Sequence, residues 1–165
     1  MCAWSSGAEP RPIRWLAGAL AVAHAAWIWT LSSQSIGGPG GELWSFLGNS
    51  FHFVLFGVLA ILLAESCRRN GAWTRRALLL VLAVTVAYGV VDELHQRATP
   101  GRSSDPADVV VDFLGAVGAL ALWWGVRGPG RVGVACLRAT GMAAIAAALN
   151  LFRLPRFGGL FRGDG

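Results

Sequence analysis

The architecture of the chain follows from residues 77–96, ALLLVLAVTVAYGVVDELHQ. The run from Ala77 to Val91 carries no charged side chain, and two acids, an imidazole and an amide then follow, ending at Gln96. About twenty mainly apolar residues are what an α-helix needs to cross a bilayer core of about 30 Å. The stretch therefore predicts a transmembrane helix whose last turns are polar.

Three more apolar segments have a similar length, namely Trp15–Leu31, Phe51–Cys67 and Val109–Val126. The 165-residue chain is 55% hydrophobic and 14% charged, whereas soluble domains carry about 25% charged residues. The predicted fold class is all-α, a polytopic membrane bundle with four transmembrane helices. The three cysteines show no paired spacing, so neither a disulfide framework nor a zinc site is expected.

Residues 132–152 are apolar and rich in alanine, but Arg138 interrupts them. The uncharged remainder, 139–149, is shorter than a membrane span. We expect a fifth helix there that packs on the bundle, lies at the cytoplasmic interface or crosses the membrane. One membrane domain over residues 1–152 follows, and the Gly- and Arg-rich tail over 153–165 has the composition of a disordered segment.

All fourteen basic residues are arginines, and their distribution predicts the orientation of the bundle. Arg97 and Arg102 lie on one side of the predicted membrane. The other side holds eight arginines, at positions 11, 14, 68, 69, 75, 76, 127 and 131. Because positive charge accumulates in cytoplasmic loops, we expect the N-terminus and the 68–76 loop in the cytoplasm. The net charge of +5 is explained by these short loops, so membrane lipids rather than nucleic acid are the expected partners.

Under this topology, polar side chains gather at the outer ends of all four helices. Ionisable groups inside a membrane are costly unless they are paired or hydrated, so they are candidates for a functional site. Arg102 lies in the turn between the third and fourth helices. The other candidate residues are Ser33, Gln34, His52, Asp92, Glu93, His95, Gln96, Asp108 and Asp112.

The periodicity indicates that these groups face one another. In the third segment Thr85, Tyr88, Asp92, His95 and Gln96 recur at spacings of three and four, which place residues on one helix face. Small residues continue the polar stripes of the second and fourth segments, and small residues let membrane helices approach closely. These residues are Gly57, Ala60 and Ala64 after His52, and Gly115 and Ala119 after Asp112. Asp105 or Ser104 is expected to cap the fourth helix, with Pro106 in its first turn.

Five motifs in a fixed order resemble the VanZ-like family, small bacterial membrane proteins named for the teicoplanin-resistance protein. They are Ser-Ser-Gln-Ser after the first helix, His-Phe in the second, Asp-Glu-x-His-Gln ending the third, Pro-Gly-Arg, and Asp-x-x-x-Asp-x-x-Gly starting the fourth. The matching positions are Ser33, Gln34, His52, Asp92, Glu93, His95, Gln96, Pro100, Gly101, Arg102, Asp108, Asp112 and Gly115.

The resemblance covers residues 15–126. The basic residue expected shortly before the histidine of the second helix is missing, since Gly48, Asn49 and Ser50 stand there. A charge-pairing role of that residue is therefore in doubt for this chain. The resemblance implies a cell-envelope function associated with glycopeptide resistance.

Several functions remain open on the residues alone. In the first, the outer polar cluster binds a lipid-linked or wall-precursor ligand at the outer face of the cytoplasmic membrane, with Arg102, Gln96 and the other polar residues as ligand contacts. In the second, the protein is an enzyme that acts on a lipid-linked phosphate, with Glu93 as base, and Arg102 would anchor the phosphate. The remaining catalytic candidates are His52, Asp92 and His95.

Two further readings stay open, a small transporter and a purely structural polar network. Histidines and carboxylates can ligate divalent metals, but the chain carries no zinc-protease pair, nucleophile elbow or dinucleotide fingerprint. No residue is assigned to a metal, and no cofactor is identified. The small-residue faces allow a homo-oligomer.

Overall fold

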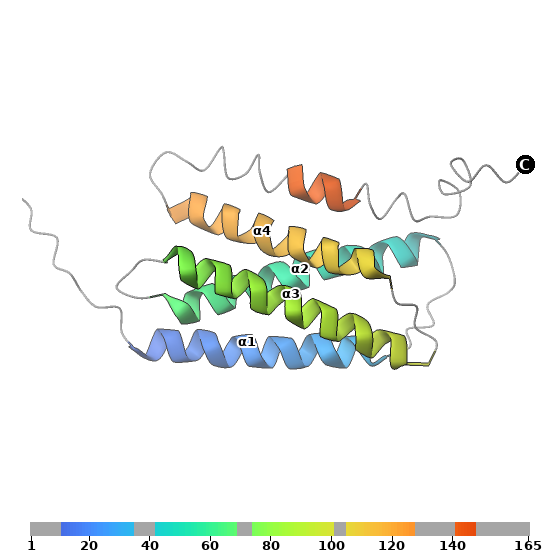
Figure 1. Cartoon of the computed structure of the whole chain (residues 1–165), viewed down its shortest axis with the longest axis horizontal. Helices are drawn as coiled ribbons and strands as arrows, with labels where there is room; N and C mark the ends of the chain where they lie inside the picture. The colour runs from blue at the N-terminus through green and yellow to red at the C-terminus, as the bar shows by residue number, and fades with distance from the viewer. Residues whose placement is uncertain (1–10, 35–41, 69–73, 101–104, 128–140, 148–165) are drawn as a thin grey trace, which may run out of the picture.

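Four long helices run along the long axis of the molecule, and each is antiparallel to the next one in the chain (Figure 1). The computed structural model describes residues 11–34, 42–68, 74–100, 105–127 and 141–147. The helices are α1 (Arg11–Ser32), α2 (Glu42–Cys67), α3 (Arg75–Ala98) and α4 (Pro106–Arg127). Each is long and apolar enough to cross a membrane, and the described ranges contain no strand. The predicted all-α membrane bundle is confirmed.

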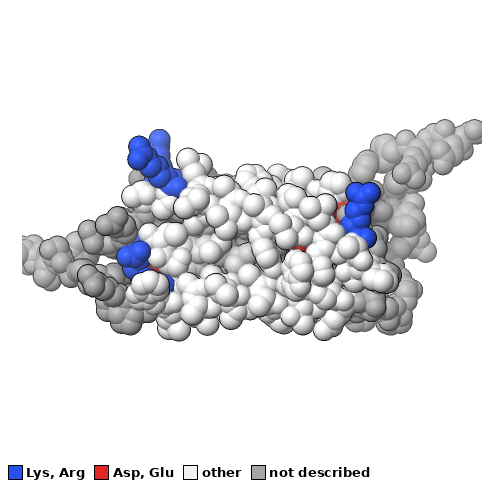
Figure 2. Space-filling view, turned by 60° about the horizontal axis from the view of Figure 1, so that its bottom comes forward, with Lys and Arg blue, Asp and Glu red and all other residues white. Residues whose placement is uncertain are grey.

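The outer surface of the bundle is apolar. Among the side chains that the structure describes, Trp15 is 79% exposed, Val22 72% and Leu79 66%, and eighteen more large apolar ones are also exposed. A water-soluble monomer rarely shows so continuous an apolar surface, whereas a lipid-facing surface requires one. On the face shown in Figure 2, the basic side chains lie at the two ends of the molecule, and the body between them is almost free of charge.

The helix ends follow from local capping chemistry. Thr74 precedes α3, and its hydroxyl accepts a hydrogen bond from the backbone N–H of Ala77 at 3.1 Å. Thr99 ends α3 in an extended conformation, with φ −87° and ψ 122°, because the residue before a proline avoids the helical region. Asp105 accepts from the N–H of Ala107 at 2.9 Å, which confirms it as the cap of α4, and Pro106 occupies the first helical position.

Helix α2 begins at Glu42, nine residues earlier than the apolar run predicts. Its 26 residues span about 39 Å, which exceeds the ~30 Å of a bilayer core. The candidate membrane span begins only at Ser50. Hydropathy locates the part of a helix that lies in lipid, whereas the helix continues until its backbone meets a stop signal. Residues 42–50, which precede the predicted apolar segment, are therefore helical as well.

Helices α2 and α4 run in the same direction and form the closest pair of the bundle. The contact depends on Gly115, where a Cβ atom would collide with the backbone carbonyl of Phe53. A Cβ at Gly57 would lie 3.1 Å from both the Gly115 carbonyl oxygen and the Cβ of Ala119. The predicted role of these small residues in close packing is confirmed.

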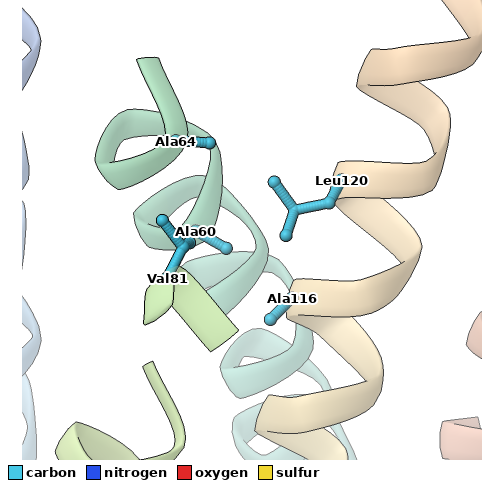
Figure 3. Packing of buried hydrophobic residues seen from close by; sticks show 5 residues of the cluster. All are labelled: Ala60, Ala64, Val81, Ala116 and Leu120. Carbon is cyan, nitrogen blue, oxygen red and sulfur yellow. The ribbon is translucent and has the colours of Figure 1, made fainter. Parts of the chain in front are cut away.

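Small side chains also fill the next turns of the α2–α4 contact (Figure 3). Ala60 and Ala64 of α2 face α4 and are fully buried, and α3 adds Val81 to the same cluster. Helix α4 contributes Ala116 and Leu120. In a membrane the separated helices would face lipid that is equally apolar, so this cluster stabilises the bundle mainly through van der Waals contacts.

A short helix over residues 141–147 lies beside α4 (Figure 1). A Cβ at Gly118 of α4 would lie 3.6 Å from the Cβ of Met142, and Ala146 is 3% exposed, so this segment packs on the bundle. The remainder of the predicted fifth helix and the 153–165 tail lie outside the described residues. Seven residues are too few to span a bilayer by themselves.

Candidate functional site

Buried polar side chains are concentrated where α1 and α3 end and where α2 and α4 begin, which we call the carboxylate end. Of the seven buried polar residues in the described part of the chain, six lie there, and they come from α1, α3 and α4. They are Ser32, Asp92, Glu93, Gln96, Asp108 and Asp112, and the seventh is Thr85. The predicted convergence of polar groups at one end of the bundle is thus present in the fold.

Asp92 lies at the centre of one hydrogen-bonded group and is 1% exposed. Its Oδ2 accepts two hydrogen bonds of 2.9 Å, from the Ser32 hydroxyl and from the Gln96 side-chain amide. Ser32 ties α1 to α3, while Gln96 lies one turn along the same helix. Among the described residues nothing donates to the buried Oδ1. The carboxylate is therefore hydrogen-bonded through one oxygen, while the other is buried without a hydrogen-bond partner among the described residues.

A second group joins α2 to α4. His52 Nδ1 and Asp112 Oδ1 are 3.3 Å apart, and the two side chains are 12% and 2% exposed. The ring of His52 also stacks on Phe56, with centroids 5.9 Å apart. Asp112 can approach α3 because that helix has Gly89 at this level, where a Cβ would lie 2.9 Å from Asp112 Oδ2. Any larger residue at position 89 would displace the carboxylate.

The two groups interact electrostatically. The carboxylates of Asp92 and Asp108 both lie within electrostatic range of His52, and Asp92 is also within electrostatic range of Asp112. Tyr88 lies one turn before Asp92 on α3 and within its electrostatic range. Its hydroxyl donates to the carbonyl of Ala25 at 2.6 Å. The carboxylate end is therefore one coupled set of charges drawn from three helices, with α1 attached through hydrogen bonds.

A third group lies at the surface. The ring of His95 stacks on Trp29, with centroids 3.8 Å apart and planes tilted by 20°. Its Nε2 is 2.8 Å from the Ser33 hydroxyl, which is itself 2.7 Å from the Trp29 carbonyl oxygen. A hydroxyl has one proton, and the carbonyl can only accept it, so Nε2–H of His95 donates to Ser33. This arrangement makes Ser33 an acceptor rather than an activated nucleophile.

The helix ends divide the site electrostatically. Helices α1 and α3 bring their C-termini, which carry partial negative charge, whereas α2 and α4 bring positive N-termini. Asp108 lies in the first turn of α4, where a carboxylate is favoured. Asp92 is bonded to Ser32, the last residue of α1, so the end of α1 opposes a negative charge at Asp92.

Most predicted site residues are brought together, but not all. Glu93 is 7% exposed and shares the buried face of α3 with Asp92. Gln34 is exposed, and its backbone N–H bonds the Leu31 carbonyl at the end of α1. Arg102 lies outside the described residues. Among the side chains that the structure places, no group of three or more His, Cys, Asp and Glu has the geometry of a metal site.

Three contributing residues were not singled out by the sequence as site residues. Ser32, rather than Ser33, contacts Asp92, and only the phase of α1 distinguishes the two serines. Trp29 stacks on the ring of His95, although a tryptophan near the end of a membrane helix is more typical of an interfacial anchor. Gly89 was recognisable as a small residue three positions before Asp92, on the polar stripe of α3.

The opposite end of the bundle has a different character. Glu65 accepts a 2.7 Å hydrogen bond from Trp123 Nε1 and lies 3.2 Å from Arg68 Nη1. Arg14 Nε donates to the Ser66 carbonyl at 3.2 Å, near the end of α2. Here the acid Glu65 has both an N–H partner and a basic partner, which is the pattern of a helix-locking network.

The comparisons with known proteins agree with this architecture. The VanZ/LLP1 family model matches residues 7–127, which include all four long helices and the carboxylate end. Neither the curated proteins nor the solved structures gave a match. The match covers well over half of the chain and extends over every motif on which the sequence resemblance depends. This membrane-type helical bundle belongs to the VanZ/LLP1 family.

Proposed function

We propose that the protein lowers glycopeptide susceptibility by binding an envelope lipid or lipid-linked wall precursor at its carboxylate end. The observation that carries this proposal is the convergence of polar side chains from all four helices on one end of an otherwise apolar bundle. Ser32, His52, Asp92 and Asp112 contribute one residue from each helix. A site assembled in this way holds its geometry only when the bundle is folded, as a binding site requires.

The depth of the site supports a lipid ligand. Asp92 lies six residues before the end of α3, or about 9 Å along the axis. Helix α3 is about 36 Å long, so a bundle centred in a ~30 Å core has Asp92 about 6 Å below the core boundary. A headgroup that reaches slightly below the interface could contact it.

The orientation is part of the proposal. The excess of arginine at the end opposite to the carboxylates favours a cytoplasmic N-terminus and an outward-facing site. Gln34→Cys and Thr74→Cys, in a chain whose native cysteines are replaced, report the two ends because both positions are exposed. A membrane-impermeant maleimide should label only Gln34→Cys in intact cells. Labelling of only Thr74→Cys would reverse the orientation.

Teicoplanin susceptibility of a sensitive Gram-positive host tests the function. The host would express wild type, Asp92→Asn, Glu93→Gln or Arg102→Ala, with membrane levels matched by immunoblot. Glu65→Gln is the matched control, because it removes a half-buried acid at the opposite end. We expect wild type and Glu65→Gln to protect and Asp92→Asn and Arg102→Ala to lose protection, whereas Glu93→Gln separates binding from catalysis as described below. Equal protection by all five proteins would show that the carboxylate end is structural.

The His52–Asp112 pair favours one alternative, an enzyme that modifies the same class of lipid. A carboxylate that orients a histidine is a recurring element of acid–base catalysis. His52→Gln and Glu93→Gln keep hydrogen bonding but remove proton-accepting ability. A binding protein should tolerate both and protect in proportion to its copy number. If the protein is an enzyme, both variants should lose protection. The wild-type enzyme should protect the host even at low copy number, because each copy turns over many substrate molecules.

A further inference from the structure

We propose that Asp92 binds a primary ammonium group, so that the ligand of the carboxylate end is an amine-bearing headgroup. This inference rests on the proposed function and narrows its ligand class. It starts from Asp92 Oδ1, which is buried and receives no hydrogen bond from any described residue. Oδ2 of the same carboxylate is already satisfied twice, by Ser32 and by Gln96. The acceptor of this carboxylate that lacks a donor is therefore one defined atom, Oδ1.

The charge balance identifies the donor as cationic. Ser32 and Gln96 are neutral, and within the described ranges Asp92 forms no ion pair. Removing a carboxylate from water is strongly unfavourable unless an opposite charge compensates it. A neutral hydroxyl would complete the hydrogen bonding of Oδ1 but would leave that charge in place.

The C-terminal end of α1 lies beside this carboxylate. Ser32, the last residue of α1, donates its hydroxyl hydrogen bond to Asp92. The C-terminus of a helix carries the negative pole of the helix dipole, which attracts a cation and repels a phosphate. A primary ammonium has three N–H donors and can donate one of them to Oδ1. A quaternary ammonium has none.

Four small probes separate these possibilities on the full-length protein in detergent. Ethanolamine, choline, glycerol and sodium chloride would be added at matched ionic strength, and the melting temperature followed by tryptophan fluorescence. Ethanolamine at ten times its Kd should raise the Tm by about 3–6 °C. Choline, glycerol and sodium chloride should have no comparable effect. An equal shift with choline would show that charge alone is recognised, and no shift with ethanolamine would overturn the proposal.

Asp92→Asn supplies the residue-specific arm, because it preserves shape but replaces the open acceptor. Its ethanolamine affinity should fall at least tenfold, whereas Glu65→Gln should bind as wild type. If Asp92→Asn binds ethanolamine with unchanged affinity, the ammonium group does not bind at this atom. The wild-type comparison of ethanolamine with choline stays decisive if Asp92→Asn does not fold.

The source of the ammonium is tested in nanodiscs. If a lipid headgroup supplies it, phosphatidylethanolamine should raise the Tm above that in phosphatidylcholine and should weaken the effect of free ethanolamine. If a free amine is the ligand, ethanolamine should act equally in both lipids. The ammonium proposal and the proposed function fail separately. If Asp92→Asn loses protection but the wild-type protein does not bind ethanolamine, only the ammonium proposal is refuted. If the wild-type protein binds ethanolamine but does not protect the host, only the resistance function is refuted.

Discussion

Gly115→Ala should weaken the α2–α4 contact more than any other single methyl addition to a described glycine. The added Cβ meets the backbone carbonyl of Phe53, which cannot rotate away, so the helices must separate by about 1 Å to restore a normal contact distance. Overpacking costs about 1–3 kcal/mol, occasionally more, and alanine returns up to about 1 kcal/mol through its helix propensity. A collision with backbone lies at the upper end of this range, so we expect a net loss of about 2 kcal/mol, or a Tm lower by about 4–8 °C.

Two glycines provide matched controls for this measurement. At Gly118 the new methyl group would have ordinary contacts, with Phe53 Cζ at 3.5 Å and Met142 Cβ at 3.6 Å. At Gly141 nothing lies within 4 Å. Both alanine variants should therefore be as stable as wild type or more stable, as measured by thermal unfolding of the purified proteins in one detergent. A Gly115→Ala protein as stable as Gly118→Ala would refute the inferred close approach of α2 and α4.

Three further substitutions test the polar contacts by the same assay. Tyr88→Phe removes the 2.6 Å bond to the Ala25 carbonyl and should cost about 1 kcal/mol, and an unchanged Tm would mean that this bond contributes nothing. His52→Leu leaves Asp112 buried without its partner and should cost about 3–5 kcal/mol, which addition of Asp112→Leu should largely restore. No recovery in the double variant would show that the pair is not the source of the loss. Thr74→Ala should cost about 1 kcal/mol through loss of the α3 cap, and a loss well above 2 kcal/mol would point to another role.

Local patterns predicted much of this protein because they act within one helix. The apolar lengths indicated four membrane helices, and the spacing of Thr85, Asp92 and Gln96 identified the buried face of α3. Asp105 was recognisable as a cap because capping depends on residues two or three positions away. The start of α2 was missed because hydropathy reports the lipid-embedded part of a helix rather than its full length.

The sequence by itself determined the membrane class, the helix faces and the end of the bundle at which the charges gather. Only the tertiary structure decided which polar groups touch. It paired Ser32 with Asp92, and it allowed Asp112 to approach α3 at Gly89. Such contacts depend on the rotation and separation of neighbouring helices, and a rotation by one residue exchanges Ser32 for Ser33. The physical reason is that packing against other helices fixes those two quantities, and no pattern within a single helix contains them.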